Sequence, residues 1–266
     1  MVIKVLFFGD IVGKPGRKAM AKVLPELKKQ LKPDLTVANA ENLAHGIGVT
    51  KKTLQEGLNL GIDFYTSGNH IWGKPEVYEI FQDLEIPIIR PANYPDSSPG
   101  LGQKLLNIGT KSILVVNLNG RVFMEEQLDC PFRKIDEILK NYKDTDLSAI
   151  IVDFHAEATS EKVALGWYVD GRVSAVLCTH THIPTCDQTI LPNGTAYVSD
   201  IGMVGAKESV IGVDKDVVIE RFLTQRPISF EIPDSKACVV NAVYLEIDPK
   251  TKKATKIQRI DQEVEI

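Results

Sequence analysis

The chain has 266 residues, of which 44% are hydrophobic and 25% charged, and its formal net charge is −4. This composition is typical of a globular protein with a sizeable core, and it excludes the disordered and fibrous classes. The 31 Lys and Arg residues form no basic block, which argues against a duplex-DNA-binding protein, because such a protein presents a positive stripe to the phosphates.

Apolar runs rich in β-branched residues predict a series of strands. They lie at residues 2–8, 35–38, 64–66, 113–118, 149–154, 173–178 and 196–198. Several are apolar throughout, which is typical of strands covered on both faces. The segment "QTILPNGTAYVSD" predicts a hairpin with an Asn-Gly turn, and two last strands are predicted at residues 237–247 and 254–260.

Three helices are predicted between these strands by apolar residues three or four positions apart. The residues are Ala19, Val23, Leu27 and Leu31; Val77, Ile80, Phe81 and Leu84; and Phe132, Ile135, Ile138 and Leu139. Pro25 lies inside the first helix and should kink it or end its first part. The alternation of strands and helices, without a repeat or a linker, predicts a single α/β domain over residues 1–266 with layered sheets.

The sequence predicts a cytoplasmic protein that does not associate with membranes. Its start, "MVIKVLFFGD", lacks the long apolar segment of a secretory signal and predicts a strand instead. No apolar run approaches the ~20 residues of a transmembrane helix. The four cysteines form no C-x-x-C pair, and free thiols are typical of the cytoplasm.

Polar side chains that can bind metal ions follow five of the predicted strands. They are Asp10; Glu41 and Asn42; Asn69 and His70; His155; and His180 and His182. In sheets of this kind, ligands bind at the carboxyl ends of the strands. His180 and His182 would also face the same point, since residues i and i+2 of an extended segment point to the same side.

Each of these residues has a structural alternative. Asp10 could cap the helix that begins near Gly16, Asn69 could be a turn residue with positive φ, and His155 could be a hydrogen-bonded core histidine. Thr159 or Ser160 is expected to cap the next helix, and Asp200 could support a metal-binding histidine. The structural alternatives must all hold independently at one edge of the sheet, so a shared site is the better hypothesis.

Carboxylate, amide and imidazole donors without thiolate suit Mn, Fe or Zn. A carboxylate that bridges can hold two ions ~3.5–4 Å apart, and such a pair can clamp the attacking and leaving oxygens of a phosphoryl group. A site of this kind needs no covalent nucleophile, because a water activated by the metal ions takes that role.

The order D … EN … GNH … H … THTH resembles the calcineurin-like metallophosphoesterases. Seven ordered segments resemble the YmdB-like branch of bacterial cyclic-nucleotide phosphodiesterases: "FFGDIVGKPGR", "AENLAHGIGVT", "SGNHIWG", "DFHAEATSEK", "THTHIPT", "LPNGTAYVSDIGMVG" and "RFLTQRP". The resemblance runs from the first strand to about Pro227. It implies an α/β fold, the calcineurin-like metallophosphoesterase sandwich, in which two β-sheets are layered with flanking helices.

The resemblance also implies a metal site with two divalent or transition-metal ions per chain, Fe or Mn first and Zn or Mg as alternatives. One ion would be held by Asp10, Glu41, Asn42 and His182. The other would be held by Glu41, Asn69, His155 and His180, with Glu41 bridging. His70 resembles the general acid of the family, and its ordinary pKa of about 6.5 suits protonation of a leaving alkoxide.

Two positions depart from the general superfamily pattern. Val12 stands where a histidine is usual, and Glu41 stands where a bridging Asp is usual. Both changes are expected of the YmdB-like branch, and Asn42 would fill the place left by Val12. Cys178 could be a soft ligand, but a small buried residue is the preferred interpretation. His45, in a glycine-flanked loop, could contact the substrate phosphate.

The function implied by the resemblance is hydrolysis of 2′,3′-cyclic and also 3′,5′-cyclic nucleotides, by in-line attack of a metal-bridging hydroxide with His70 as general acid. The expected partner is a small nucleotide, without duplex nucleic acid or membrane, and a homo-oligomer stays open. A phosphomonoesterase or protein phosphatase on the same fold is one alternative. A nucleotide-binding regulator is another.

Overall fold

The computed structural model describes residues 2–266 and contains two six-stranded β-sheets. The first sheet has the order β12-β11-β10-β1-β2-β3. Its strands are β1 (Ile3–Ile11), β2 (Leu35–Asn39), β3 (Phe64–Thr66), β10 (Met203–Ala206), β11 (Ala237–Ile247) and β12 (Ala254–Glu265). β1 runs parallel to β2 and β10, and β2 runs parallel to β3, so these strands end at the same edge.

The second sheet has the order β4-β5-β6-β7-β9-β8. Its strands are β4 (Gln103–Ile108), β5 (Lys111–Asn119), β6 (Ala149–His155), β7 (Ala175–Thr179), β8 (Thr189–Ile190) and β9 (Ala196–Val198). β5, β6, β7 and β9 are parallel, whereas β4 and β8 are antiparallel edge strands. The predicted Asn-Gly hairpin is confirmed as the β8–β9 pair.

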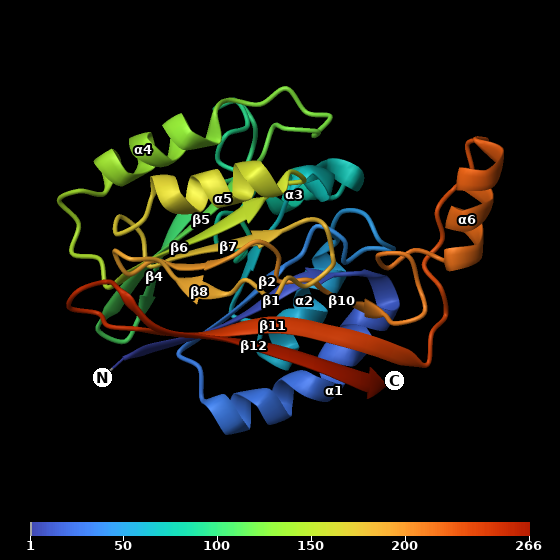
Figure 1. The fold of residues 1–266 in the computed structure, drawn as a ribbon, viewed down its shortest axis with the longest axis horizontal. Helices are drawn as coiled ribbons and strands as arrows, with labels where there is room; N and C mark the ends of the chain where they lie inside the picture. The colour runs from blue at the N-terminus through green and yellow to red at the C-terminus, as the bar shows by residue number, and fades with distance from the viewer. Residues whose placement is uncertain (1) are drawn as a thin grey trace.

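The helices are α1 (Gly13–Leu31), α2 (Lys51–Leu60), α3 (Val77–Ile80), α4 (Pro131–Asn141), α5 (Thr159–Tyr168), α6 (Lys215–Thr224) and the 3₁₀ helix η1 (Asn69–Gly73). Helices cover the outer faces of both sheets, whereas α6 stands apart from them (Figure 1). In Figure 1, α4 and α5 lie above the sheets, α1 lies below them, and α6 projects at the right. The predicted α/β fold with layered sheets and flanking helices is confirmed.

The layers explain why the strands are apolar throughout. Along β1, Val5 and Phe7 belong to the core between the two sheets, whereas Leu6 and Phe8 belong to the core under α1. Because successive side chains of a strand point to opposite faces, a strand between two cores must be apolar at every position. Polar residues are then confined to the strand ends.

α1 continues through Pro25, so this proline does not end the helix, and Leu24 and Leu27 on either side of it are buried in the core. One helix prediction needs correction. The helix predicted from Val77 is only one turn long and ends at Ile80. Within residues 2–266, no helix is long and apolar enough to cross a membrane.

Candidate metal centre

The polar residues predicted from the strand ends come together at the carboxyl edges of both sheets. Asp10 lies near the end of β1, Glu41 and Asn42 follow β2, Asn69 opens η1 after β3, His155 ends β6, and His180 follows β7. Parallel pairing of these strands within each sheet sets their ends side by side. Asp10, Glu41, Asn42 and His155 are almost completely buried.

One group of donor atoms surrounds His182. Its Nε2 lies 3.7 Å from Asp10 Oδ1 and 3.2 Å from Asn42 Nδ2. Asn42 Nδ2 in turn donates to Glu41 Oε1 at 3.3 Å. The far ring nitrogen of His182, Nδ1, donates to the carbonyl oxygen of Ile211 at 2.7 Å. Nε2 of His182 is therefore unprotonated in the neutral ring and faces the other donors.

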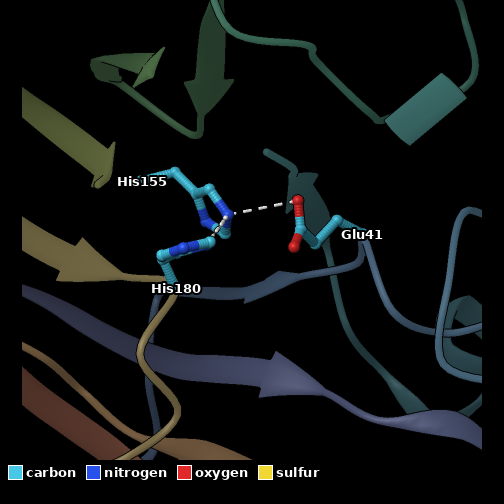
Figure 2. Close-up of side chains that lie close together, drawn as sticks. All are labelled: Glu41, His155 and His180. Atoms are coloured by element: carbon cyan, nitrogen blue, oxygen red, sulfur yellow. Dashed lines mark hydrogen bonds and ion pairs between the residues drawn. The ribbon is translucent and has the colours of Figure 1, made fainter. Parts of the chain in front are cut away.

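A second group of donor atoms surrounds His155. Its Nε2 lies 3.2 Å from Glu41 Oε2, 3.2 Å from Asn69 Oδ1 and 3.0 Å from His180 Nδ1. Figure 2 shows Glu41, His155 and His180 pointing toward one another, and their ligand atoms all lie within 4.8 Å of each other. The two oxygens of Glu41 thus face two different groups of donors.

The backbone at the two neighbouring histidines differs from the extended segment that the sequence predicted. β7 ends at Thr179, and φ is +100° at His180 and +65° at His182. Non-glycine residues adopt positive φ rarely and at some cost, commonly at functional sites. Both imidazoles face one cavity because of this left-handed backbone, and the prediction that strand alternation would align them is wrong.

A glycine makes room for the second group. A β-carbon on Gly68 would overlap both Glu41 Oε2 and His155 Nε2. Gly68 has an extended backbone, so space rather than φ requires a glycine at this position. The segment "SGNH" can therefore pass against the buried carboxylate while it presents Asn69 and His70.

The ionisable groups of the centre shift one another's pKa values. Burial alone would raise the pKa of Glu41, but the charges and hydrogen bonds of His155 and His70 hold it well below its ordinary value. Burial alone would lower the pKa of His155, but Glu41 raises it to about 9. Burial and the neighbouring His155 lower the pKa of His180 to about 3. Buried carboxylates and imidazoles this close together favour the presence of a positive charge among them.

Asp10 supplies a further test of whether the residues fit a metal ion. Its Oδ2 accepts a hydrogen bond from the backbone N–H of His180, but its buried Oδ1 has no hydrogen-bond partner among residues 2–266. A buried carboxylate oxygen without a partner is costly unless a cation takes that place. Oxygen and nitrogen donors without thiolate are also the ligands of Mn, Fe or Zn. The residues therefore fit a metal centre.

His70 lies beside the centre and is only partly buried. Its Nδ1 is 3.1 Å from Asn42 Oδ1 and 3.2 Å from Glu41 Oε1, and its backbone N–H donates to Glu41 Oε2 at 3.0 Å. The hydrogen bond with Glu41 raises the pKa of His70 above its ordinary value. A raised pKa favours the protonated ring that a general acid needs at neutral pH.

A cavity of about 550 Å³ opens over these residues. Its lining includes Glu41, Asn42, His70, His180 and His182. His45, exposed and with positive φ, lies at its wall, as do Ile47, Phe230 and Ile232. Phe230 and Ile232 were not predicted as site residues, because they lie in the connection between β10 and β11, just after the segment "RFLTQRP" and outside every quoted motif.

Glu157 was also not predicted as a site residue, although it lies in the segment "DFHAEATSEK". Its Oε2 is 3.1 Å from His180 Nε2, and its side chain is half exposed at the cavity. Since a carboxylate holds the proton on Nε2, Nδ1 of His180 is left to face the donor cluster. Its position two residues after His155 is the feature of the sequence that could have identified it.

The structural alternatives for Asp10 and Asn69 do not hold, whereas His155 is completely buried and hydrogen-bonded, which fits both of its interpretations. α1 begins at Gly13 and is preceded by Val12, so Asp10 does not cap it. Asn69 opens η1 and is absent from the positive-φ positions of residues 2–266. Cys178 packs in the core under α5, which supports the small-residue interpretation.

Two smaller predictions are wrong. α5 begins at Thr159 after Ala158, and no side chain of the described chain caps it, because neither Thr159 nor Ser160 precedes its first turn. Asp200 contacts no histidine of the described residues. Its Oδ2 instead accepts from Lys162 Nζ at 2.8 Å and from Thr181 Oγ1 at 2.7 Å, and Thr181 lies between the two histidines.

Comparison with known proteins finds a family and relatives that match most of the chain. The family model described as "YmdB-like protein" matches residues 6–260. The chain is 45% identical over 259 residues to the 2′,3′-cyclic-nucleotide 2′-phosphodiesterase of Bacillus subtilis, and this match covers 97% of this chain and 96% of that protein. The crystal structure of a novel phosphatase from Mycoplasma pneumoniae is similar with a TM-score of 0.93 and 33% identity, and covers 100% of this chain and 95% of that one.

A more distant structure shares the fold alone. The 5′-nucleotidase precursor of Thermus thermophilus has a TM-score of 0.57 and 10% identity, and the match covers 98% of this chain and 54% of that one. At this identity the likeness concerns the arrangement of sheets and helices, and nothing about substrate follows from it.

Proposed function

The chain belongs to the YmdB-like protein family, and from that premise we propose that it is a dinuclear metal phosphodiesterase that opens cyclic nucleotides. 2′,3′-cyclic monophosphates are the first substrates, and 3′,5′-cyclic monophosphates are further ones. The observation that carries the proposal is that the two oxygens of Glu41 face different groups of donors, one around His182 and one around His155. This is the arrangement a bridging carboxylate needs.

The ligands divide between two ions. Asp10, Glu41, Asn42 and His182 would hold one, and Glu41, Asn69, His155 and His180 would hold the other. Fe or Mn is the first choice for these oxygen and nitrogen donors, and Zn or Mg is the alternative. When bound, the ions would supply positive charge to the phosphoryl oxygens and activate a water as the nucleophile.

His70 is the general acid. Asn42 Oδ1 and Glu41 Oε1 both lie beside Nδ1, so this nitrogen carries a proton and the ring is held in one orientation. In the protonated ring, which the raised pKa of His70 favours, Nε2 carries a second proton that it can donate to the leaving oxygen of a substrate in the cavity. A cyclic diester keeps that oxygen tethered after the bond breaks, so the proton acceptor stays within reach of His70.

The cavity walls support a nucleotide as substrate. Ile47, Phe230 and Ile232 add apolar side chains to the lining of the cavity that holds the polar donors. Phe230 is about half exposed, and the guanidinium of Arg221 lies over its ring, 4.6 Å from the ring centroid. Aromatic rings stack on nucleobases without reading their edges, so selectivity between bases should be weak. His45 contacts the substrate phosphate from the cavity wall.

A phosphomonoesterase is the second candidate, and the phosphatase from M. pneumoniae favours it. The cavity has no Lys or Arg side chain among its lining residues within the described part of the chain. A monoester carries one more negative charge than a diester at neutral pH, so this lining favours the diester. A regulator that binds nucleotide without cleaving it would not need the buried set of donors.

We further propose that residues 1–266 form one domain, since one apolar core joins β1 of the first sheet to β5 and β6 of the second. We also place the enzyme in the cytoplasm, where four free cysteines would stay reduced. A homo-oligomer is compatible with the exposed apolar residues of α6, Phe222 and Leu223.

Removal of metal is the first test. The purified protein should contain two transition-metal ions per chain, and a chelator should abolish hydrolysis of 2′,3′-cyclic AMP. Fe²⁺ or Mn²⁺ should restore it better than Zn²⁺ or Mg²⁺. Elemental analysis and assays before and after chelation measure both effects. Less than one ion per chain, together with full activity after chelation, would contradict the proposal.

A further inference from the structure

A chain of hydrogen bonds lies behind His155, on the side away from the proposed metal ions. Nδ1 of His155 is 2.9 Å from Thr179 Oγ1, and Thr179 Oγ1 donates to Asp153 Oδ1 at 2.7 Å. All three side chains are completely buried. Strand register builds this chain, because His155 lies opposite Thr179 in the β6–β7 pair and Asp153 is two residues earlier on β6.

Asp153 acts only as an acceptor. Besides Thr179, it accepts hydrogen bonds from Thr66 Oγ1 at 2.5 Å and from Asn39 Nδ2 at 3.1 Å. No Lys or Arg within residues 2–266 forms an ion pair with it. Burial raises the pKa of Asp153, and the three donors aimed at its carboxyl group oppose that effect. Asn39 and Thr66 come from the first sheet, so the carboxylate also joins the two sheets behind the centre.

The protons of this chain can be accounted for. A threonine hydroxyl has one hydrogen, and Thr179 gives it to Asp153. Toward His155, the same oxygen can therefore only accept, and Nδ1 must carry the proton. Asn39 Nδ2 lies 3.4 Å from Nδ1, but its two hydrogens go to Ser67 O and Asp153 Oδ2. Asp10 Oδ1 is 3.9 Å from Nδ1, beyond hydrogen-bond distance.

The other two imidazoles show why the carboxylate is needed. Nδ1 of His182 donates to a backbone carbonyl, and Nε2 of His180 lies against the carboxylate of Glu157. Those partners can only accept, so each fixes its histidine by itself. A hydroxyl can donate or accept, so Thr179 alone would leave the tautomer of His155 undetermined. Asp153 removes that freedom.

We propose that Asp153 and Thr179 are positioning residues that keep the proton of His155 on Nδ1, so that Nε2 stays unprotonated for a metal ion. The inference rests on the metal site of the proposed function. Such hydrogen-bond partners behind a ligand usually change metal affinity by about 10–100-fold. If these residues only satisfy buried polar groups, their loss should change stability but not metal affinity.

Zinc binding to the metal-free protein tests the proposal without reference to catalysis. Thr179→Val keeps the shape of the side chain and removes the hydroxyl, so the dissociation constant for the zinc ion at His155 should rise about 10–100-fold. Thr179→Ser restores a hydroxyl and should restore most of the affinity. Competition with a chromophoric chelator gives the constants.

Thr36→Val is the matched control. Thr36 is a completely buried threonine on β2, and its Oγ1 has no hydrogen-bond partner in the described chain. The same chemical change at this position should leave zinc affinity unaltered. Thermal unfolding of each metal-free variant separates a general loss of stability from a loss of affinity.

The tautomer can be observed directly by ¹⁵N NMR of histidine-labelled protein loaded with zinc. The chain has only five histidines, and His155 should show a protonated Nδ1 that exchanges slowly and a zinc-bound Nε2. Asp153→Asn should reverse the hydrogen bonds, because the new amide can donate to Thr179, which then donates to Nδ1. Nε2 would then carry the proton, and zinc affinity should fall as in Thr179→Val.

The outcomes separate the two proposals. If wild-type protein binds zinc but Thr179→Val binds it equally tightly, the positioning role is overturned and the proposed function stands. A zinc-bound Nδ1 at His155 would overturn it as well. If wild-type protein binds no zinc at His155, both the metal site and the positioning role are wrong.

Discussion

Glu41→Gln is expected to lower kcat/KM for 2′,3′-cyclic AMP by at least about 10³-fold. Loss of one preorganised electrostatic contact commonly lowers the rate by about 10²–10³-fold. Glu41 is buried, and its two oxygens face both groups of donors, so one substitution weakens two sites. Glutamine keeps the shape but replaces one charged oxygen by an amide. Steady-state kinetics and elemental analysis of the variant give the two readouts.

Asn42→Ala is the comparison for Glu41→Gln. Asn42 lies beside His182 and His70 but contacts only the first group of donors, so its loss should be smaller. Metal content should fall mainly at one ion in Asn42→Ala and at both in Glu41→Gln. Equal losses of activity, with both ions retained in each variant, would mean that Glu41 is not the bridge.

His70→Ala is expected to keep both ions and to lose about 10²–10⁴-fold in kcat, the usual contribution of general acid catalysis. The ring touches the centre through Asn42 and Glu41, and its side chain is partly exposed to the cavity. Its proton matters only when the leaving oxygen is a strong base. The loss should therefore be much smaller for a nitrophenyl diester than for 2′,3′-cyclic AMP.

The two leaving groups make this an internal control. Both substrates use the same centre, so a general disturbance of the site would slow them equally. An equal loss on the good and the poor leaving group would remove His70 from the acid role. Metal analysis of the variant guards against an indirect effect through Glu41.

Much of the fold follows from local pattern. Most of the strands could be predicted, because a strand between two apolar cores is apolar at successive positions, as Leu6 and Phe7 show. β4 and β10 were not predicted, since β4 is only partly buried and β10 is four residues long with an internal glycine. The ends of the predicted strands then identify the polar residues of the centre. α3 was overestimated because the spacing of Val77, Ile80 and Phe81 does not show where packing ends a helix.

The rest depended on tertiary structure. Positive φ at His180 and His182 is not encoded in any pattern of apolar residues, so their convergence was expected for the wrong reason. Phe230 reaches the cavity wall from a long connection whose path only the complete fold sets. Asp153 lies within a predicted apolar run and Thr179 directly follows another, and the sequence does not indicate that these two side chains form a hydrogen bond.

The central claim, that the centre acts on cyclic phosphodiesters, is tested most directly by comparing substrates under one metal condition. kcat/KM is measured for 2′,3′-cyclic AMP, 3′,5′-cyclic AMP and 5′-AMP with the same Mn²⁺-loaded protein. We expect the 2′,3′-cyclic diester to be the best substrate, because its strained ring opens with the leaving oxygen still beside His70, while the cavity lining offers no Lys or Arg within residues 2–266 for the extra charge of a monoester. If 5′-AMP has the highest kcat/KM, the protein is a phosphomonoesterase and the claim is wrong.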